Sequence, residues 1–276
     1  MNFISTFSHS GITGKIIVAV YNLSKMDLNW ENIENFDLTF EGDWTNMKAY
    51  GGDKNIFNQF INNIFDRNQN NHNRVLLHNE CPDFGKINLL RNYFNCENIK
   101  LQQLITKKIK FNQDILNEVR KYKTKFNIDK DTLGIHFRLT SLNKYHGKDY
   151  GFIHYEDYIN KIREIIKVNN ISKLFIISDN NESIIKISNE ETLKDLDIQF
   201  ISEYTRMDTE VVNDGFIDFE IPNLFKKNFY EEVIIEALLL SMCGYLIHRQ
   251  SSVSLLSCLL SNSLRLDTCY KLNSKS

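Results

Sequence analysis

The second half of the chain alternates apolar runs of strand length with longer amphipathic segments. The runs expected to form strands are residues 132–139, 173–179, 197–203 and 244–252. Apolar residues then recur at helical spacing, which predicts helices over 156–168, from 182, over 230–243 and from 253. Strands that alternate with helices are typical of a parallel sheet with both faces covered.

The first half has a weaker pattern. Residues 57–65 have apolar positions at helical spacing, residues 101–126 are expected to be mostly helical, and 75–80 form a short apolar run that predicts a strand. Residues 14–26 follow the glycine-containing loop SHSGITG and suit either a helix or a strand. Together the two halves predict an α/β fold.

Length and charge narrow the class of protein. A chain of 276 residues is long enough for two lobes, each with its own core. A net charge of −2 and a pI near 6.4 argue against a nucleic-acid binder that works through a basic surface. No apolar run is long enough to span a membrane and no basic leader precedes one, so we expect a cytoplasmic chain without a transmembrane segment.

The five cysteines show no CxxC pattern and no Cys/His spacing of a metal site. Cys243 and Cys258 lie in apolar helical surroundings, where a thiol usually behaves as a small hydrophobic group. We therefore expect neither structural zinc nor a disulfide framework.

Candidate binding residues follow the predicted strands. In parallel sheets ligands bind outside the carboxyl ends of the strands, and this rule gathers Arg138, Asp179 and the pair Ser251–Ser252. The two serines open a helix, whose free backbone N–H groups suit a phosphate. Arg138 is always charged and is costly at the end of a buried strand unless it meets an anion. Because the chain has neither a Walker A loop nor GxGxxG, these residues predict a nucleotide diphosphate site of another kind.

Each candidate also has a purely structural interpretation. Arg138 suits an ion pair at a strand end, and His136 suits an orienting or core role. Asp179 suits an N-cap for the helix at ESIIKIS. Glu236 suits the solvated side of its helix, and Asp149 suits a solvated loop. The sequence leaves these alternatives open.

Three blocks in order resemble a known family. GIHFRLTS…FIHYEDYI, FIISDNNESI and EEVIIEALLLSMCGYLIHRQSSVSLLSCLL are similar to the blocks of α1,6-fucosyltransferases and NodZ-type enzymes, over residues 133–260. The resemblance implies a GT-B architecture, with two Rossmann-like lobes and a cleft between them. It also implies an N-terminal acceptor-side lobe over 1–128 and a C-terminal lobe over 129–276 that binds the nucleotide sugar.

The resemblance also assigns roles to residues. Arg138 falls on the arginine that contacts the donor diphosphate, Glu236 on an acid that helps to hold the base, and Ser251 and Ser252 on phosphate-contacting serines. Asp149 falls where the family has a proposed catalytic base, with Asp157 and His146 as further options for that role. The remaining donor-site positions are His136, Tyr158, Asp179 and Gly11.

The sequence departs from the family pattern G-V-H-x-R-R-T-D-K at Leu139, Ser141 and Leu142, which replace an arginine, an aspartate and a lysine. The resemblance implies a metal-independent, inverting glycosyltransferase that moves fucose or another deoxyhexose from a GDP-activated donor to a glycan hydroxyl. It implies no cofactor besides this donor. The departures leave two alternatives, a GT-B transferase with a different nucleotide-sugar donor and a non-catalytic module that binds a nucleotide or glycan.

Overall fold

The computed structural model describes part of the chain, and every structural statement below concerns that part. The described residues are 2–5, 13–14, 16–17, 19–20, 37–40, 74–77, 102, 106, 109–137, 153–204, 206, 229–249, 251–262, 264 and 267–272.

A five-stranded parallel sheet organises the second half of the chain. Its strands, in spatial order, are β6 (Asp197–Gln199), β5 (Lys173–Ser178), β4 (Thr132–Phe137), β7 (Tyr245–His248) and β8 (Cys269–Lys271). All four neighbouring pairs are parallel. The parallel sheet predicted from the alternating pattern is therefore confirmed, although the edge strand β8 was not predicted, since its three residues are too few to show a period.

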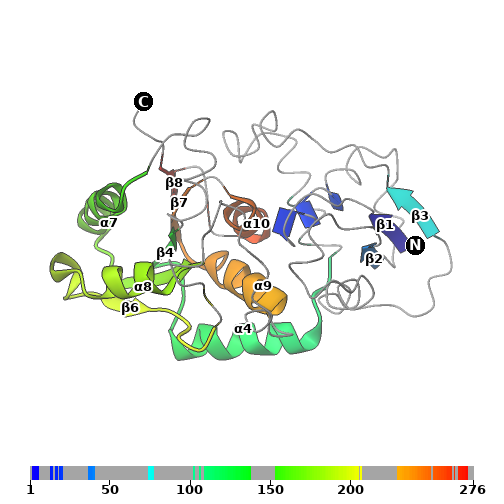
Figure 1. Ribbon diagram of the computed structural model, residues 1–276, viewed down its shortest axis with the longest axis horizontal. Coiled ribbons are helices and arrows are strands. Elements are labelled where there is room, and N and C mark those ends of the chain that lie inside the picture. Colours follow the sequence, from blue (N-terminus) through cyan, green and yellow to red (C-terminus); the bar gives the residue numbers. More distant parts are fainter. Residues whose placement is uncertain are drawn as a thin grey trace.

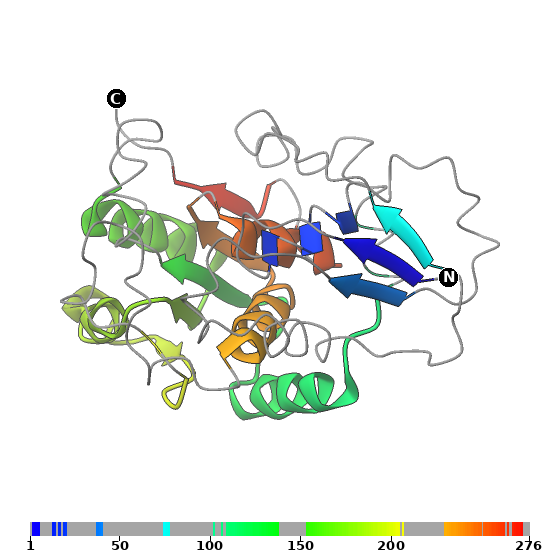
Figure 2. The same cartoon turned by 45° about the vertical axis from the view of Figure 1, so that its right-hand side comes forward.

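A second, smaller sheet belongs to the first half. Its strands β2 (Asp37–Phe40), β1 (Asn2–Ser5) and β3 (Arg74–Leu77) pair in parallel, with β1 in the centre. The apolar run at 75–80 predicts β3, whereas β1 and β2 contain only two apolar residues each and were not predicted. Figures 1 and 2 show this sheet at one end of the molecule, beyond the segment 13–20.

Two sets of helices cover the larger sheet. One core contains residues of α7 (Tyr155–Asn169), α8 (Asn181–Ser188) and the 3₁₀ turn η4 (Glu191–Leu193). The other contains residues of α4 (Gln113–Lys125), α9 (Phe229–Leu240), α10 (Ser252–Leu260) and the segment 13–20. Helices on both faces and a strand order that runs outward in both directions from β4 define a doubly wound α/β layout.

The helices lie close to their predicted positions. The helices predicted over 156–168 and 230–243 occupy 155–169 and 229–240, and the last one begins at 252 rather than 253. The strand predicted over 197–203 ends at Gln199. Helix spacing thus located these elements to within a few residues, and the largest errors concern where strands and helices end.

Alternation along β4 separates the two cores. Leu133, Ile135 and Phe137 belong to the core under α7 and α8. Gly134 points to the other side, where a Cβ would lie 2.8 Å from Leu240 Cδ2, so the glycine lets α9 approach the sheet. A Cβ at Gly244 would lie 1.7 Å from the Lys130 carbonyl oxygen, which requires glycine just before β7.

Local polar residues define where the helices begin. Asn180 caps α8 by accepting a hydrogen bond from the Ser183 backbone N–H at 2.8 Å. At the start of α7, the Asp157 carboxylate accepts a hydrogen bond from the His154 backbone N–H at 2.9 Å, as in a capping box. The helix ends at Asn170, which has a left-handed backbone with φ of 54°.

The helix α4 packs on the larger sheet. It lies against α9, and the Tyr122 and Phe126 rings stack 5.7 Å apart in the core that also contains Phe175 of β5. These residues precede the predicted lobe boundary at 128 but pack with the second half. The division into lobes at this position stays a prediction.

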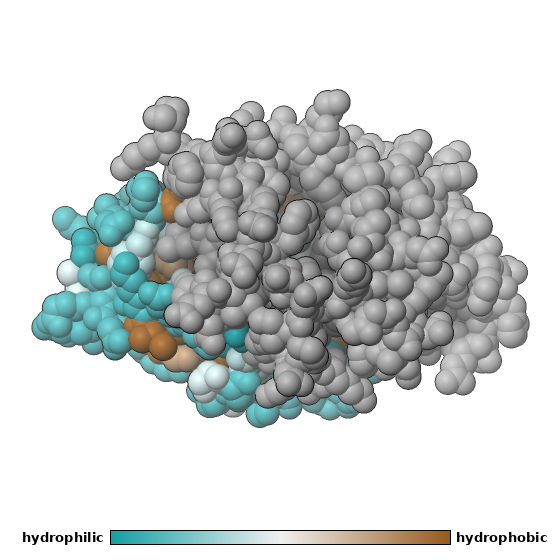
Figure 3. All heavy atoms as spheres, in the orientation of Figure 1, coloured by the Kyte–Doolittle hydropathy of each residue, from teal (hydrophilic) through white to brown (hydrophobic). Residues whose placement is uncertain are grey.

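The described surface over α7 and α8 is mainly hydrophilic (Figure 3). Among all the described residues, Val168 and Ile185 are the only large hydrophobic residues that are exposed. Among the described helices, none has the length and apolar character needed to cross a membrane.

Candidate functional site

The candidate site lies where the strand order of the larger sheet reverses. Strand β4 pairs with β5 on one side and with β7 on the other, and the chain then continues outward to β6 and to β8. Since loops from adjacent strands diverge at this point, a crevice outside the carboxyl ends of β4 and β7 is the expected ligand position. His136 and His248 are register partners at these ends.

His136 links the end of β4 to the start of α10. Its Nδ1 lies 2.6 Å from Ser254 Oγ and 3.1 Å from Ser251 Oγ, and the two hydroxyls lie 3.1 Å apart. Ser251 is the N-cap of α10 and accepts a hydrogen bond from the Ser254 backbone N–H at 3.1 Å. All three side chains are buried. This cluster therefore holds a helix N-terminus against the strand end that leads to Arg138.

The start of α10 also contacts the first half of the chain. Thr13 is buried, and its Oγ1 lies 2.8 Å from Ser252 Oγ. Ile16, Ile17, Ala19 and Val20 pack in the same core as α10, and both ribbon views place the described part of this segment beside that helix (Figures 1 and 2). The positive end of the α10 dipole therefore lies where the two halves of the chain meet, which favours an anion there.

Tyr158 lies in the core rather than at the surface. It is fully buried, its ring centroid lies 4.4 Å from that of Phe137, and its hydroxyl donates to the His136 carbonyl at 3.3 Å. The residue is thus close to the strand end, but its contacts are with the backbone and with the apolar core.

Asp179 directly follows β5, at the same edge of the sheet. It is half-buried, and the N-cap of the following helix is Asn180. The capping interpretation of Asp179 is therefore wrong, because the neighbouring asparagine fills that role.

Glu236 forms a buried ion pair. Its Oε1 lies 2.8 Å from Arg206 Nη2, and the two side chains are 12% and 2% exposed. Arg206 also donates from Nη1 to the carbonyls of Ile201 and Tyr204, at 2.7 and 3.2 Å. The solvated interpretation of Glu236 is therefore wrong.

The charges around Glu236 affect its ionisation. Burial raises the pKa of Glu236 to about 7, against the lowering by Arg206, and the negative charges of Glu232 and Asp179 raise it further. The Asp179 carboxylate, at the end of β5, therefore lies near enough to Glu236 on α9 for its negative charge to raise the pKa of Glu236. Asp179 and Glu236 are thus two predicted residues whose charges interact.

Sequence reasoning missed two buried arginines. Arg206 follows β6 by several residues, and Arg249 directly follows β7; both residues are buried. Arg249 had a usable signal, since a cation after a short buried strand was the same feature that drew attention to Arg138. Arg206 had none, because its partner lies 30 residues further along the chain.

His248 serves a structural role at the end of β7. It is completely buried, with its Nδ1 lying 3.1 Å from the Arg249 carbonyl. Burial lowers the pKa of His248 to about 4, so the imidazole is neutral near pH 7.

Several predicted residues lie outside the described part of the chain: Gly11, Arg138, His146 and Asp149. Asp157, the second option for the base after Asp149, belongs to the capping box of α7. Among the described residues, no three His, Cys, Asp or Glu side chains lie together as metal ligands would. The described site therefore offers hydrogen-bond donors, a helix N-terminus and paired charges.

Comparison with known proteins gives structural neighbours only. No protein-family model matches the chain, and no curated protein matches it significantly. The fucosyltransferase NodZ from Bradyrhizobium is 13% identical, with a TM-score of 0.49 over 94% of this chain and 92% of that chain. A structure of POFUT1 in complex with GDP is 8% identical, with a TM-score of 0.46 over 98% and 97%.

A second crystal form of POFUT1 with GDP is 9% identical, with a TM-score of 0.39 over 63% of this chain. The chain spans half the length of that protein chain. NodZ and POFUT1 are therefore structural neighbours of this chain at low sequence identity.

Proposed function

We propose that the chain is a glycosyltransferase that moves a sugar from a nucleotide-activated donor, GDP-fucose or another GDP-deoxyhexose, to a glycan hydroxyl. The observation that carries the proposal is the convergence of His136, Ser251 and Ser254 at the carboxyl ends of β4 and β7. There they hold the N-terminus of α10 beside the strand end that continues to Arg138. The order of the three sequence blocks supports the same activity.

The proposed chemistry needs positive groups for the departing nucleoside diphosphate. In the first turn of α10 the Ser254 backbone N–H is used by the Ser251 cap, and the backbone N–H groups of Ser252 and Val253 suit phosphate oxygens. Arg138, one residue beyond β4, supplies a planar cation for the same diphosphate. Donors of this kind stabilise charge that develops as the glycosidic bond breaks.

Three described residues act as positioning groups in this proposal. Ser251 and Ser254 use their hydroxyls on His136 and on the helix backbone, so they orient α10. Tyr158, which donates to the His136 carbonyl, holds the last residues of β4 and hence the direction in which the chain leaves toward Arg138. Asp149 is proposed as the base that takes the proton from the acceptor hydroxyl, because a loop carboxylate suits that step.

A thermal-shift screen tests the donor. The full chain is heated with GDP, UDP, dTDP and their sugars, and GDP compounds are expected to raise the unfolding temperature most. At about 100 times the dissociation constant a ligand adds roughly 2.7 kcal/mol of stability, which is easily visible. A shift with UDP or dTDP compounds alone favours the alternative of a different donor, and no shift with any of them contradicts a nucleotide site.

Turnover separates an enzyme from a binding module. Slow release of free sugar from the donor that shifts the unfolding temperature marks a transferase whose acceptor is replaced by water. Tight binding without any release favours the non-catalytic alternative, which the loss of two charges at Ser141 and Leu142 supports.

Replacing Arg138 tests the mechanism. Arg138→Ala is expected to lower turnover by ~10²–10³ while the unfolding temperature without ligand stays unchanged. The matched control is Arg163→Ala, since Arg163 is 44% exposed on α7. Activity close to wild type in Arg138→Ala would end the assignment.

A further inference from the structure

Two thiols from different elements lie in contact behind the candidate site. Cys258 in the last turns of α10 and Cys269 in the edge strand β8 have their Sγ atoms 3.9 Å apart. Neither is in a disulfide. Cys258 is 4% exposed within the core, whereas Cys269 is half-buried and packs against that core from the edge of the sheet. The pair therefore combines a protected thiol with one that a small reagent is able to reach.

The position of the pair connects it to the site. The helix α10 begins at the Ser251 cap and ends two residues after Cys258, while β8 pairs only with β7 in the described sheet. A covalent bond between the two sulfurs would join the helix to a strand on the far side of β7. Closing the pair from 3.9 Å to the bond length of about 2 Å needs only a small side-chain rotation or backbone shift.

We propose that Cys258 and Cys269 form a reversible disulfide that ties α10 to the edge of the sheet. The proposal goes beyond the transferase activity and does not depend on it. Cys243 is not part of the pair, because it lies against Gly134 of β4 and its Sγ is 3.7 Å from the Leu239 carbonyl oxygen.

The oxidant in the proposed reaction is a low-molecular-weight disulfide such as glutathione disulfide. The Cys269 thiolate attacks one sulfur, the glutathione S–S bond breaks, and one glutathione leaves with a mixed disulfide remaining on Cys269. The Cys258 thiolate then attacks the Cys269 sulfur, the mixed disulfide breaks, and a second glutathione leaves. Two protein thiols lose their hydrogens and two electrons, and the oxidant becomes two thiols.

The test maps the bond in the wild-type chain. The full chain is equilibrated with glutathione disulfide, remaining thiols are blocked by alkylation, and peptides are identified by mass spectrometry. The expected result is a peptide that links Cys258 to Cys269, two alkylated thiols fewer of the five, and reversal by dithiothreitol. The oxidised chain is expected to unfold several degrees higher, since a cross-link restricts the unfolded state.

Variants identify the order of attack. Cys258→Ala is expected to stop at a glutathione adduct on Cys269, whereas Cys269→Ser is expected to give neither the adduct nor the linked peptide. Cys243→Ser is the matched control and should cross-link like the wild type. Because the first measurement uses the wild type, a variant that fails to fold does not weaken the test.

The proposal also predicts that the folded chain forms the cross-link faster than the unfolded chain. Cross-linking should be at least tenfold faster in the native chain than in the same chain in urea, where the two sulfurs are no longer held together. Equal rates in the two conditions, absence of the linked peptide, or a native product that joins Cys258 to another cysteine would each overturn the proposal.

Discussion

The two faces of the larger sheet have different chemistry, although the same strands contribute to both. On the α7 and α8 face, β4 contributes Leu133, Ile135 and Phe137 to an apolar core. On the opposite face it contributes Gly134 and His136, which meet α9 and the start of α10. The buried Arg206–Glu236 pair involves α9 on this second face.

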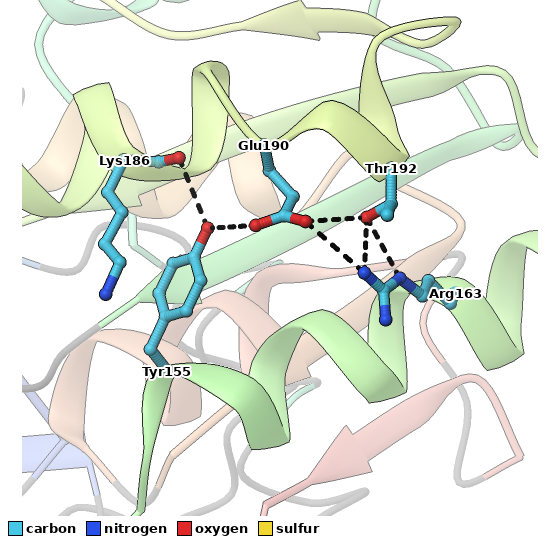
Figure 4. A network of polar contacts seen from close by, with 5 residues as sticks. All are labelled: Tyr155, Arg163, Lys186, Glu190 and Thr192. Carbon is cyan, nitrogen blue, oxygen red and sulfur yellow. Dashed lines mark hydrogen bonds and ion pairs between the residues drawn. The ribbon is translucent and has the colours of Figure 1, made fainter.

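Polar groups occur on both sides, but in different places. On the α7 and α8 side, Tyr155, Arg163, Lys186, Glu190 and Thr192 form one network (Figure 4), in which Tyr155 alone belongs to the core. Its ion pair, Arg163–Glu190, spans 3.3 Å with side chains 44% and 22% exposed. On the other side, polar groups are buried between helices and sheet, which costs free energy. The buried ion pair of these two therefore lies on the α9 side of the sheet, and the exposed one on the α7 side.

The largest expected effect concerns the two ion pairs. Arg206→Ala should lower the free energy of unfolding by about 3–5 kcal/mol, because it leaves the Glu236 carboxylate buried without its cation. Arg163→Ala, the exposed counterpart, should cost ~1 kcal/mol or less. Urea denaturation at neutral pH measures both. Equal losses of unfolding free energy in the two variants would contradict the difference between the buried and the exposed ion pair. The double variant Arg206→Met with Glu236→Leu should recover most of the stability that Arg206→Ala loses.

The next effect concerns the apolar face. Ile135→Ala should lower the free energy of unfolding by about 2–5 kcal/mol, because it opens a cavity in the core under α7. Nucleotide affinity of the remaining folded chain should stay unchanged, since the side chain points away from α10. Calorimetric titration with GDP checks this, and a clear loss of affinity would show that the two faces do not act separately.

A pH titration tests the buried acid. With its pKa raised from 4.5 to about 7, Glu236 keeps its proton in the folded chain over a range in which the unfolded chain has released it. Its stabilising contribution is therefore complete below pH 4.5 and is lost as the pH rises through 7. Relative to Glu236→Gln, the wild type should lose roughly 1–3 kcal/mol across this window.

The sign of the change in unfolding free energy with pH shows whether burial or the attraction to Arg206 controls the ionisation of Glu236. Unfolding free energies of both chains, measured by urea denaturation at pH 4.5, 5.5, 6.5 and 7.5, give the difference directly. If the wild type instead gains stability relative to Glu236→Gln as the pH rises, attraction to Arg206 outweighs burial.

The smallest expected effect concerns His136 and the start of α10. His136→Ala should weaken GDP binding by about tenfold, because Ser251 and Ser254 lose their partner and the start of α10 is less firmly held. Ile135→Val, one residue earlier on the opposite face, is the matched control and should leave the affinity unchanged. Unaltered GDP affinity in His136→Ala would separate the cluster from the binding site.

Most of the second half could be predicted because each signal is local. The helices at 155–169 and 229–240 are long enough to show the helical period in the sequence. Runs of apolar residues likewise mark β4, β5 and β7. Strands β1, β2 and β8 could not be found in this way, since each contains only two apolar residues. Their backbone hydrogen bonds come from partners far away in sequence.

The candidate site was predicted in part for the same reason. Strand ends marked Asp179 and the Ser251–Ser252 turn, because the rule for parallel sheets needs only element order. Local sequence did not reveal that Ser254 would contact His136, that Thr13 would reach Ser252, or that Arg206 would pair with Glu236. These contacts join residues 30 to 239 positions apart.

By itself the sequence determined the α/β class and the order of elements that brings His136 and Ser251 to one edge of a sheet. Only the tertiary structure decided which neighbours those side chains have, which acid is buried beside an arginine, and which two thiols touch. The physical reason is that periodicity depends on residues a few positions apart, whereas burial, ion pairing and hydrogen bonding between elements depend on distances in the folded chain.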